Sequence, residues 1–470
     1  MFRPPIQIGQ RVVGHATTRG VLYRLEWLFV TGALFIFSGA VLPILLGLGD
    51  SRFDPTVGNP TLQLIFGVIY VLSGAFVLAS WQSLIKHKVT LVLILLILAY
   101  VASSSLWSYD QDLTLRRSVA LLGTSLFGLQ LGVRFSRRAV LDVAFVAMAA
   151  TIVACIVFLL FTSLGTAYGD QDGAVNGAFI HKNSAGRAAA FTLITGVPSY
   201  LYASRAATRV AIVATMSATT VLLLATRSVT ALLVCVTTFL FIAFVWLARR
   251  WPAITFATVA ILLVAVGGLF VTLETADVDA ALQLFGRDLT LTGRVELWAL
   301  LLEVSEGNRA FGSGYNAFWG GGSDGISAYV WQLLPWEPPH AHNGYLDILL
   351  ELGWVGLVAA AVVFLRTAVA VVQRIRRDGD PYAYWALSCL WMLGSLNLTE
   401  STGLSGNNLF TVIFLAIAFG RTGSVKADPA LNRRPILVQR PDRRYQTHHQ
   451  VQTSSATYRA VTHRDMRARR

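Results

Sequence analysis

The stretch HAHNGYLDILLELGWVGL, residues 340–357, opens an apolar segment with two histidines and a carboxylate. Its second histidine, His342, is the residue type best suited to accept a proton near neutral pH, because an unperturbed imidazole has a pKa of about 6.5. His340 lies two residues earlier and is a supporting candidate. Asp347 either orients a histidine or receives its proton. Such groups are costly in lipid, so they indicate a functional cavity at this end of the helix.

The helix that follows His342 should present one polar face. Asn343, Asp347 and Glu351 recur every four residues and therefore share a side of a helix. Gly353 and Gly356 lie three residues apart, a spacing that permits close packing against a neighbouring membrane helix.

Three other polar islands interrupt the hydrophobic sequence. They are LWSYDQDLTLRRS at 106–118, FIHKNSAGRAAA at 179–190 and LTGRVELW at 291–298. The second island contains His181, Lys182 and Asn183 in succession. We expect the islands to meet at one end of a helical bundle.

The composition indicates an integral membrane protein. The chain of 470 residues is 55% hydrophobic and 13% charged, with a mean hydropathy of +0.59, whereas soluble domains carry about 25% charged residues. Its net charge of +13 does not indicate nucleic-acid binding, because residues 422–470 hold 11 Lys/Arg against 3 Asp. That segment is typical of a disordered cytoplasmic tail that sets topology and solubility; the alternative is contact with anionic lipid headgroups.

About twelve apolar runs are long enough to cross about 30 Å of hydrocarbon. They lie at 27–48, 62–85, 89–107, 117–133, 139–163, 186–203, 208–225, 229–247, 252–273, 350–373, 383–399 and 407–420. The predicted organisation is a cytoplasmic N-terminus over 1–26, helices one to nine over 27–273, an outward loop over 274–342, helices ten to twelve over 343–421 and the basic tail over 422–470. The fold class is an all-α polytopic membrane protein.

Basic clusters on every second connection set the orientation. By the positive-inside rule both termini are cytoplasmic, and the connections that carry acidic residues, together with the long loop 274–342, face outward. That loop combines glycine-rich sequence, a predicted helix near 293–305 and several tryptophans. The aromatic residues either anchor the loop at the membrane interface or stack on sugar rings.

Cationic residues on the outward side are not explained by topology. Some snorkel or pair at the surface, but as a set they predict a cavity for anions, and phosphate is favoured because guanidinium groups bind it through paired hydrogen bonds. The set is Arg116, Arg117, Lys182, Arg187, Arg227, Arg287, Arg294 and Arg309.

Two other acidic features bear on substrate and metal binding. Glu400, in NLTESTGLSGNN, is an outward carboxylate that either binds sugar hydroxyls or pairs with one of the arginines. Asp277 and Asp279 form a DxD string of the kind that holds a nucleotide-sugar metal ion. The string follows a helix end without a nucleotide-binding domain, so no metal site is predicted there.

With these residues in place, the chain resembles the O-antigen ligase and Wzy-type polysaccharide polymerase superfamily. The pattern HN-x9-GxxG after a long outward loop is similar to that superfamily, and HKNSAG at 181–186 and TGR at 292–294 resemble its ExoQ-like branch. WSYDQDLTLRRS at 107–118 is similar to a further segment of that branch. The resemblance covers roughly residues 107–420.

The resemblance implies an inverting, metal-independent glycosyltransferase of the multi-helix GT-C-like class in the bacterial inner membrane, with its active site on the periplasmic face. Its donor would be a glycan on undecaprenyl diphosphate. His342 matches the family's essential histidine, Arg294 a loop arginine thought to bind the diphosphate, and Arg227 a second such arginine. Other implied partners are membrane lipids, a flippase and chain-length regulators; no cofactor or nucleic acid is implied.

Three functions remain open from the sequence. The leading one is a polymerase that joins lipid-linked repeats into exopolysaccharide, and a close relative is an O-antigen ligase that transfers the glycan to the lipid A core. The alternative from another class is a secondary transporter or lipid-linked sugar flippase. That alternative predicts internal repeats and helices broken by Gly or Pro near the midplane, and the sequence indicates neither.

Overall fold

The computed structural model describes residues 10–40, 42, 59–166, 173–253, 293–320 and 325–420. It divides the chain into two units, Met1–Thr422 and Gly423–Arg470, and the tail predicted over 422–470 lies outside the described residues. In the described part, helices are joined by short turns, and the β structure is one isolated bridge between Thr166 and Val175. The all-α membrane class is therefore confirmed.

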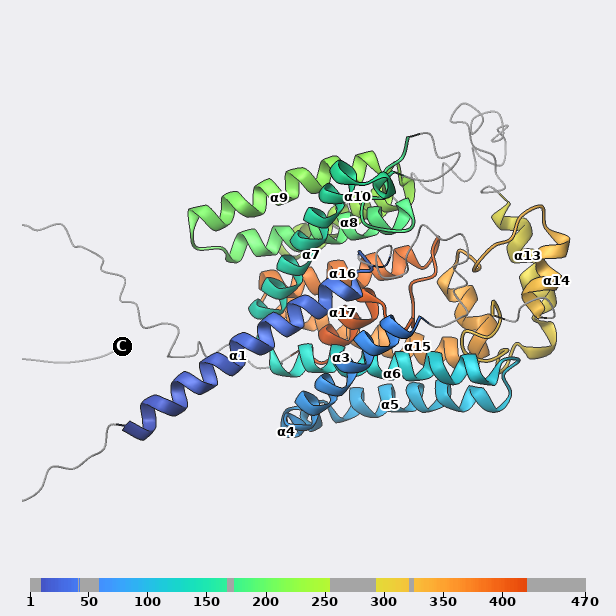
Figure 1. Cartoon of the computed structure of the whole chain (residues 1–470), viewed down its shortest axis with the longest axis horizontal. Coiled ribbons are helices and arrows are strands. Elements are labelled where there is room, and N and C mark those ends of the chain that lie inside the picture. Colours follow the sequence, from blue (N-terminus) through green and yellow to red (C-terminus); the bar gives the residue numbers. More distant parts are fainter. Residues whose placement is uncertain are drawn as a thin grey trace, which may run out of the picture. The chain divides into compact units, whose positions relative to one another are not determined.

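Eleven of the predicted spans correspond to helices, and most of the twelfth, 252–273, lies outside the described residues (Figure 1). These helices are α1 (Gln10–Phe37), α3 (Pro60–Leu78), α5 (Lys88–Ser103), α6 (Gln111–Arg134), α7 (Arg137–Phe161), α8 (Lys182–Tyr202), α9 (Ala206–Ala225), α10 (Val229–Arg250), α15 (Gly344–Arg377), α16 (Pro381–Leu396) and α17 (Leu409–Ala418). By length and composition, 7 candidate membrane spans are found among the described residues. The count of twelve stays a prediction.

Short helices fill the connections. They are α4 (Trp81–Leu84), α13 (Arg294–Val304), α14 (Ile326–Leu333) and the 3₁₀ turns η1 (Ile85–His87), η2 (Ser104–Leu106), η3 (Ser163–Gly165) and η4 (Glu306–Asn308). The helix predicted near 293–305 is thus confirmed as α13. Leu297 and Leu301 of α13 and Val330 of α14 are buried in one cluster with Leu346 and Leu350 of α15, so the outward loop is packed onto the start of α15.

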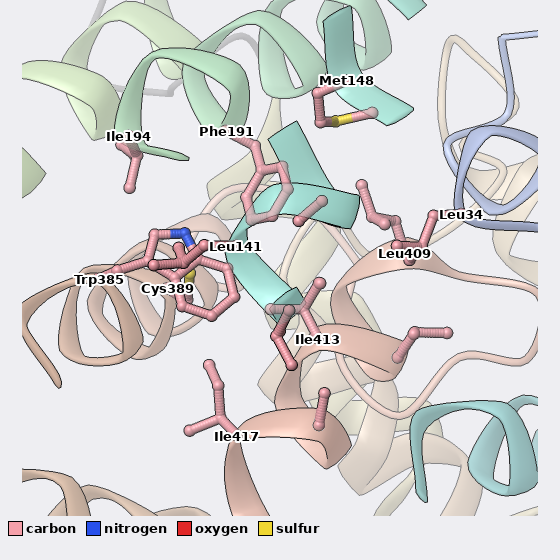
Figure 2. Packing of buried hydrophobic residues seen from close by; sticks show 14 of the residues in the cluster. Leu34, Leu141, Met148, Phe191, Ile194, Trp385, Cys389, Leu409, Ile413 and Ile417 are labelled. Atoms are coloured by element: carbon pink, nitrogen blue, oxygen red, sulfur yellow. The ribbon is translucent and has the colours of Figure 1, made fainter. Parts of the chain in front are cut away.

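The core of the bundle is an apolar cluster to which most of the long helices contribute, and Figure 2 shows its residues from α1, α7, α8, α16 and α17. Phe191 of α8 lies 6.5 Å from Trp385 of α16, measured between ring centroids. The indole N–H of buried Trp385 donates to Thr195 Oγ1 at 3.1 Å, which satisfies a polar group that burial would otherwise leave unpaired. This core holds α8 and α16, whose outward ends carry site residues.

Small residues allow α6 and α17 to approach closely. A Cβ added at Gly128 would lie 2.7 Å from the Cβ of Leu415, and one added at Gly132 would lie 2.9 Å from the carbonyl oxygen of Ala416. Such contacts are typical of membrane helices, where backbone proximity provides van der Waals packing.

Helix α15 is broken at Gly353, which contradicts the expectation that no helix is broken by glycine. Gly353 has φ 65° and ψ −169°, a conformation that L-residues with side chains rarely adopt. A Cβ there would overlap the carbonyl of Ala310. The predicted role of Gly353 in helix-to-helix packing is therefore wrong: the glycine serves a close approach of loop backbone. The nearest atoms to a Cβ on Gly356 belong to Leu352 of its own helix.

The outward loop satisfies the backbone groups freed by this break. The N–H groups of Trp354 and Val355 donate to the carbonyls of Arg309 and Ala310 at 2.9 and 3.3 Å. On the other side of the break, the carbonyls of residues 350 and 351 accept from the N–H groups of residues 313 and 314 at 2.9 and 3.0 Å. Tyr100 of α5 adds a hydroxyl bond to the carbonyl of residue 352 at 2.8 Å. A broken helix is tolerated at membrane depth only with such partners.

We predict that Gly353→Ala destabilises the protein strongly. A backbone at φ 65° and ψ −169° is essentially restricted to glycine and costs a residue with a Cβ about 1–3 kcal/mol, and the overlap with Ala310 adds to it. The thermal unfolding midpoint in detergent should fall clearly. Gly67→Ala in α3 is the control, because a Cβ there meets nothing within 4 Å. Equal midpoints for both variants would show that the break does not require glycine.

Candidate functional site

The two histidines lie on a tight turn before α15. His342 has φ 50°, and its backbone N–H donates to Nδ1 of His340 at 3.1 Å. The carbonyl of Ala341, between them, accepts from the indole N–H of Trp298 at 2.8 Å. Asn343 ends the turn by capping α15, its Oδ1 accepting from the N–H groups of residues 345 and 346 at 3.1 and 3.2 Å. A left-handed non-glycine residue costs about 1–3 kcal/mol and persists where its surroundings hold it.

The carboxylate of Asp347 hydrogen-bonds this turn and the segments next to it. The buried Oδ1 accepts from the N–H of Ala341 at 3.1 Å and from the indole N–H of Trp319 at 2.8 Å, and Oδ2 accepts from the hydroxyl of Ser401. The Ser401 oxygen also lies 3.4 Å from Nδ1 of His340. Asp347 was expected either to orient a histidine or to receive its proton. Its geometry is that of an orienting group, and Asp347 acts on the backbone of the turn.

The imidazoles of His340 and His342 face each other, with ring centroids 4.2 Å apart. Burial lowers the pKa of His342, the charge of Arg294 lowers it further, and Glu400 opposes the change. Burial lowers the pKa of His340 to about 3, aided by the neighbouring cations. Both rings are therefore neutral at pH 7, but His340 is a weak proton acceptor and its Nδ1 already accepts a hydrogen bond. Nδ1 of His342 is buried without a hydrogen-bond partner.

Glu400 joins the histidine turn to α8. Its Oε1 accepts from the amide of Asn183 at 2.9 Å, and its Oε2 lies 3.7 Å from Nη1 of Arg187. The amide oxygen of Asn183 in turn accepts from the hydroxyl of Ser228 at 2.9 Å. Of the two alternatives for Glu400, pairing with an arginine is the one that the structure displays.

Arg294 reaches the same place from the outward loop. It is the first residue of α13 and follows Gly293, whose φ of 81° turns the chain into the helix. Its Nη1 donates to the carbonyl of Thr399 at 3.1 Å, one residue before Glu400. The side chains of α8, α13, the histidine turn and the 399–401 loop therefore converge.

A metal ion is the first ligand to test against this arrangement. One ligand atom from each of His340, His342 and Glu400 lies within 4.8 Å of the others, and neutral imidazoles with a carboxylate are common metal donors. Arg187 already pairs with the carboxylate, and the charge of Arg294 acts on both histidines. These guanidinium groups oppose a cation, and the arrangement suits an anion better.

The comparisons with known proteins cover part of this region. Residues 211–361, which run from α9 into α15 and include both histidines and Arg294, match the family described as O-Antigen ligase. Over these residues, about a third of the chain, the protein is similar to that family. It is also 29% identical over 113 residues to "Exopolysaccharide production protein ExoQ" of Rhizobium meliloti (strain 1021). That match covers 22% of this chain and 25% of the relative, so the chain aligns with about a quarter of that protein's length.

Other predicted residues lie around the centre. His181 caps α8, its Nδ1 accepting from the N–H of Asn183 at 3.2 Å; burial lowers the pKa of His181, and Glu400 opposes this. Lys182 begins α8 and is half-buried. Arg227 is exposed with φ 50° and directly precedes Ser228, which bonds Asn183.

The remaining outward cations have other partners. Arg116 is exposed and its Nε lies 3.4 Å from the carbonyl of Asp112 in its own helix. Arg117 acts electrostatically on Glu351 of α15. Arg309 pairs with Glu306 at 3.2 Å. Arg287 and the DxD string at 277–279 lie outside the described residues.

Several residues at the centre were not identified from the sequence. Ser401 and Trp319 bind Asp347. Asn397 holds the other side of the turn: its Oδ1 accepts from the N–H groups of residues 402 and 403 at 3.1 and 2.7 Å, and its carbonyl accepts from Gly344 at 2.9 Å. The only sequence signal for Ser401 was its position next to Glu400. Trp298, Trp319 and Trp331 all donate their indole N–H within the loop region, a structural role that neither aromatic interpretation predicted.

We predict that the buried Arg187–Glu400 pair is energetically coupled. Arg187→Met leaves an unpaired carboxylate and Glu400→Gln leaves an unpaired guanidinium, and breaking a buried pair costs about 3–5 kcal/mol. Each single variant should lower the thermal midpoint in detergent, and the double variant should lower it by less than the sum. A double variant that lost the full sum of the two effects would show that the two groups act independently.

Proposed function

We propose that this protein is a membrane glycosyltransferase that polymerises undecaprenyl-diphosphate-linked oligosaccharide repeats into exopolysaccharide. The observation that carries the proposal is a neutral imidazole, His342, held on a clamped turn among guanidinium groups. A transporter would use a broken helix to bind its substrate, but the backbone groups freed in α15 are taken by loop 309–314.

His342 acts as the general base in this proposal. A sugar hydroxyl of the acceptor attacks the anomeric carbon of the donor, and its proton passes to the imidazole as the new C–O bond forms. The bond from the anomeric carbon to the lipid diphosphate breaks, and the electron pair leaves with the phosphate oxygen. Attack opposite the leaving group inverts the anomeric configuration. His340, with a pKa of about 3, is the weaker base and serves to hold the backbone N–H of His342.

The cationic groups stabilise the leaving diphosphate. It is already a good leaving group and gains negative charge in the transition state, so it needs fixed positive charge more than a protonated acid. Arg187 and Arg294 both act electrostatically on His340. Lys182 and the N-terminus of α8 add positive potential, and Arg227 is assigned to a more distant part of the lipid-linked substrate.

O-antigen ligase activity is the second candidate, because the matched family carries that description. Polymerase and ligase share the donor and the chemistry at His342, and they differ in the acceptor. The similarity to an exopolysaccharide production protein supports the polymerase.

We predict that the purified protein extends lipid-diphosphate-linked repeats in the presence of EDTA and without nucleotide. His342→Ala should lower the rate by about 10²–10⁴-fold, the usual contribution of a general base. His87→Ala, which removes an imidazole packed against Phe419, is the control and should keep normal activity. Gel analysis of chain length measures growth; transfer to lipid A core alone would indicate the ligase, and full activity of His342→Ala would remove His342 from the mechanism.

We also predict opposite pH shifts in two variants. The base must be unprotonated, so kcat/KM falls as the pH drops through the pKa of His342, which lies below 6.5. Arg294→Gln removes a charge that lowers this pKa, so the acid limb should move to higher pH. Glu400→Gln removes a charge that raises it, so the limb should move to lower pH. Shifts in the same direction would show that the limb reports another group.

A further inference from the structure

A cavity lies beside the histidine turn. It has a volume of about 230 Å³ and is lined by Trp319, His340, Asp347, Glu351, Ser401 and Ser405, among others. His340 contributes to its wall, and the ring of His340 is 4.2 Å from that of His342. A molecule held in the cavity therefore comes within one ring's width of the proposed base.

The lining of this cavity differs from the surroundings of Glu400. Arg187, Arg294 and His181 act on His340 from one side, whereas two carboxyl groups, those of Asp347 and Glu351, line the cavity. The Asp347 carboxyl already binds the turn and Trp319. Glu351 accepts a hydrogen bond from the backbone N–H of Asn316. Among the described residues no Lys or Arg lines this cavity, so it offers a diphosphate no fixed positive charge.

The lining suits a ligand rich in hydroxyl groups. Carboxyl groups and serine hydroxyls both hydrogen-bond sugar hydroxyls, and Trp319 adds an aromatic ring. The cavity volume of about 230 Å³ is below the ~300–1,000 Å³ of pockets for drug-sized ligands, so it fits a single sugar ring. A lipid chain is better matched by a separate cavity between α5, α15 and α17, whose lining is apolar and includes Ile97, Leu357 and Phe414.

We propose that this cavity binds an uncharged sugar ring of the acceptor and that Glu351 determines which ring is accepted. The inference rests on the proposed function, because it assigns the acceptor to the carboxyl-lined side of the turn and the donor diphosphate to the arginine side. Glu351 hydrogen-bonds the sugar hydroxyls and takes no part in the proton transfer.

The first test needs no turnover. Ser405→Cys places a thiol in the cavity and Lys182→Cys places one on the arginine side; the three native cysteines are buried. Alkylation of each variant by a small maleimide is timed with oligosaccharides of one to three repeats released from the host's own polysaccharide, or with inorganic pyrophosphate. We expect oligosaccharide to slow labelling several-fold at Ser405→Cys only, and pyrophosphate to slow it at Lys182→Cys only. Protection of Ser405→Cys by pyrophosphate, or its full reactivity in oligosaccharide, overturns the assignment.

The second test separates the acceptor from the donor by kinetics. Glu351→Gln keeps the shape of the side chain but replaces one carboxyl oxygen by an amide nitrogen and so removes a hydrogen bond to the sugar. This should raise KM for the acceptor about tenfold and leave KM for the donor unchanged. Glu306→Gln, on the exposed pair with Arg309, is the matched control and should change neither. A rise in the donor KM alone overturns the inference. If His342→Ala stays active while Glu351→Gln shows the acceptor defect, the base assignment fails and the cavity assignment stands.

Discussion

The site depends on the backbone hydrogen bonds that tie loop 309–314 to the break in α15. A helix interrupted inside a membrane protein leaves N–H and C=O groups that lipid cannot satisfy. Here the four groups around Gly353 are paired with the loop, so the loop and the break stabilise each other. Gly312 and Gly314 have φ values of 73° and 101°, which explains why the loop is rich in glycine. The short first segment of α15 is thereby fixed against the outward loop, and the histidine turn stands on that segment.

A buried carboxylate carries this rigidity to the turn. Asp347 binds the N–H of Ala341, the indole of Trp319 and the hydroxyl of Ser401, so it joins the turn to the outward loop and to the 399–401 connection. The left-handed backbone of His342 is maintained by these contacts together with the cap at Asn343. The strain at His342 is therefore held by several elements together.

The sequence predicted the parts of this structure that follow from local pattern. Hydrophobic run length located the helices, since each must span the same thickness of hydrocarbon, and the helix after Gly293 was expected where α13 lies. The histidines, Asn183, Arg187, Arg294 and Glu400 were candidates because charged groups at helix ends are costly in lipid, and the structure brings them together.

The remaining features were decided by contacts between distant segments. Gly353 was expected to pack helices, but its role depends on Ala310, which is 43 residues earlier. Ser401 and Trp319 contribute by hydrogen-bonding the carboxylate of Asp347, which is distant from both in sequence. Arg116 is a cationic residue like those of the site, yet its guanidinium group lies against the backbone of its own helix. Residue type identified candidates, and only the packing of loop against broken helix selected among them.

The charges around the imidazole of His342 fit the needs of the proposed reaction. A base that is to accept a proton near neutral pH must not be protonated beforehand, and Arg294, to which we assign the diphosphate, also lowers the pKa of His342. In the proposed mechanism a bound diphosphate would partly cancel that positive field and so raise the pKa of His342 in the complex. The base would then be stronger when the donor is in place, and Glu400 acts in the same direction. Donor binding and proton acceptance would in this way be coupled through Arg294.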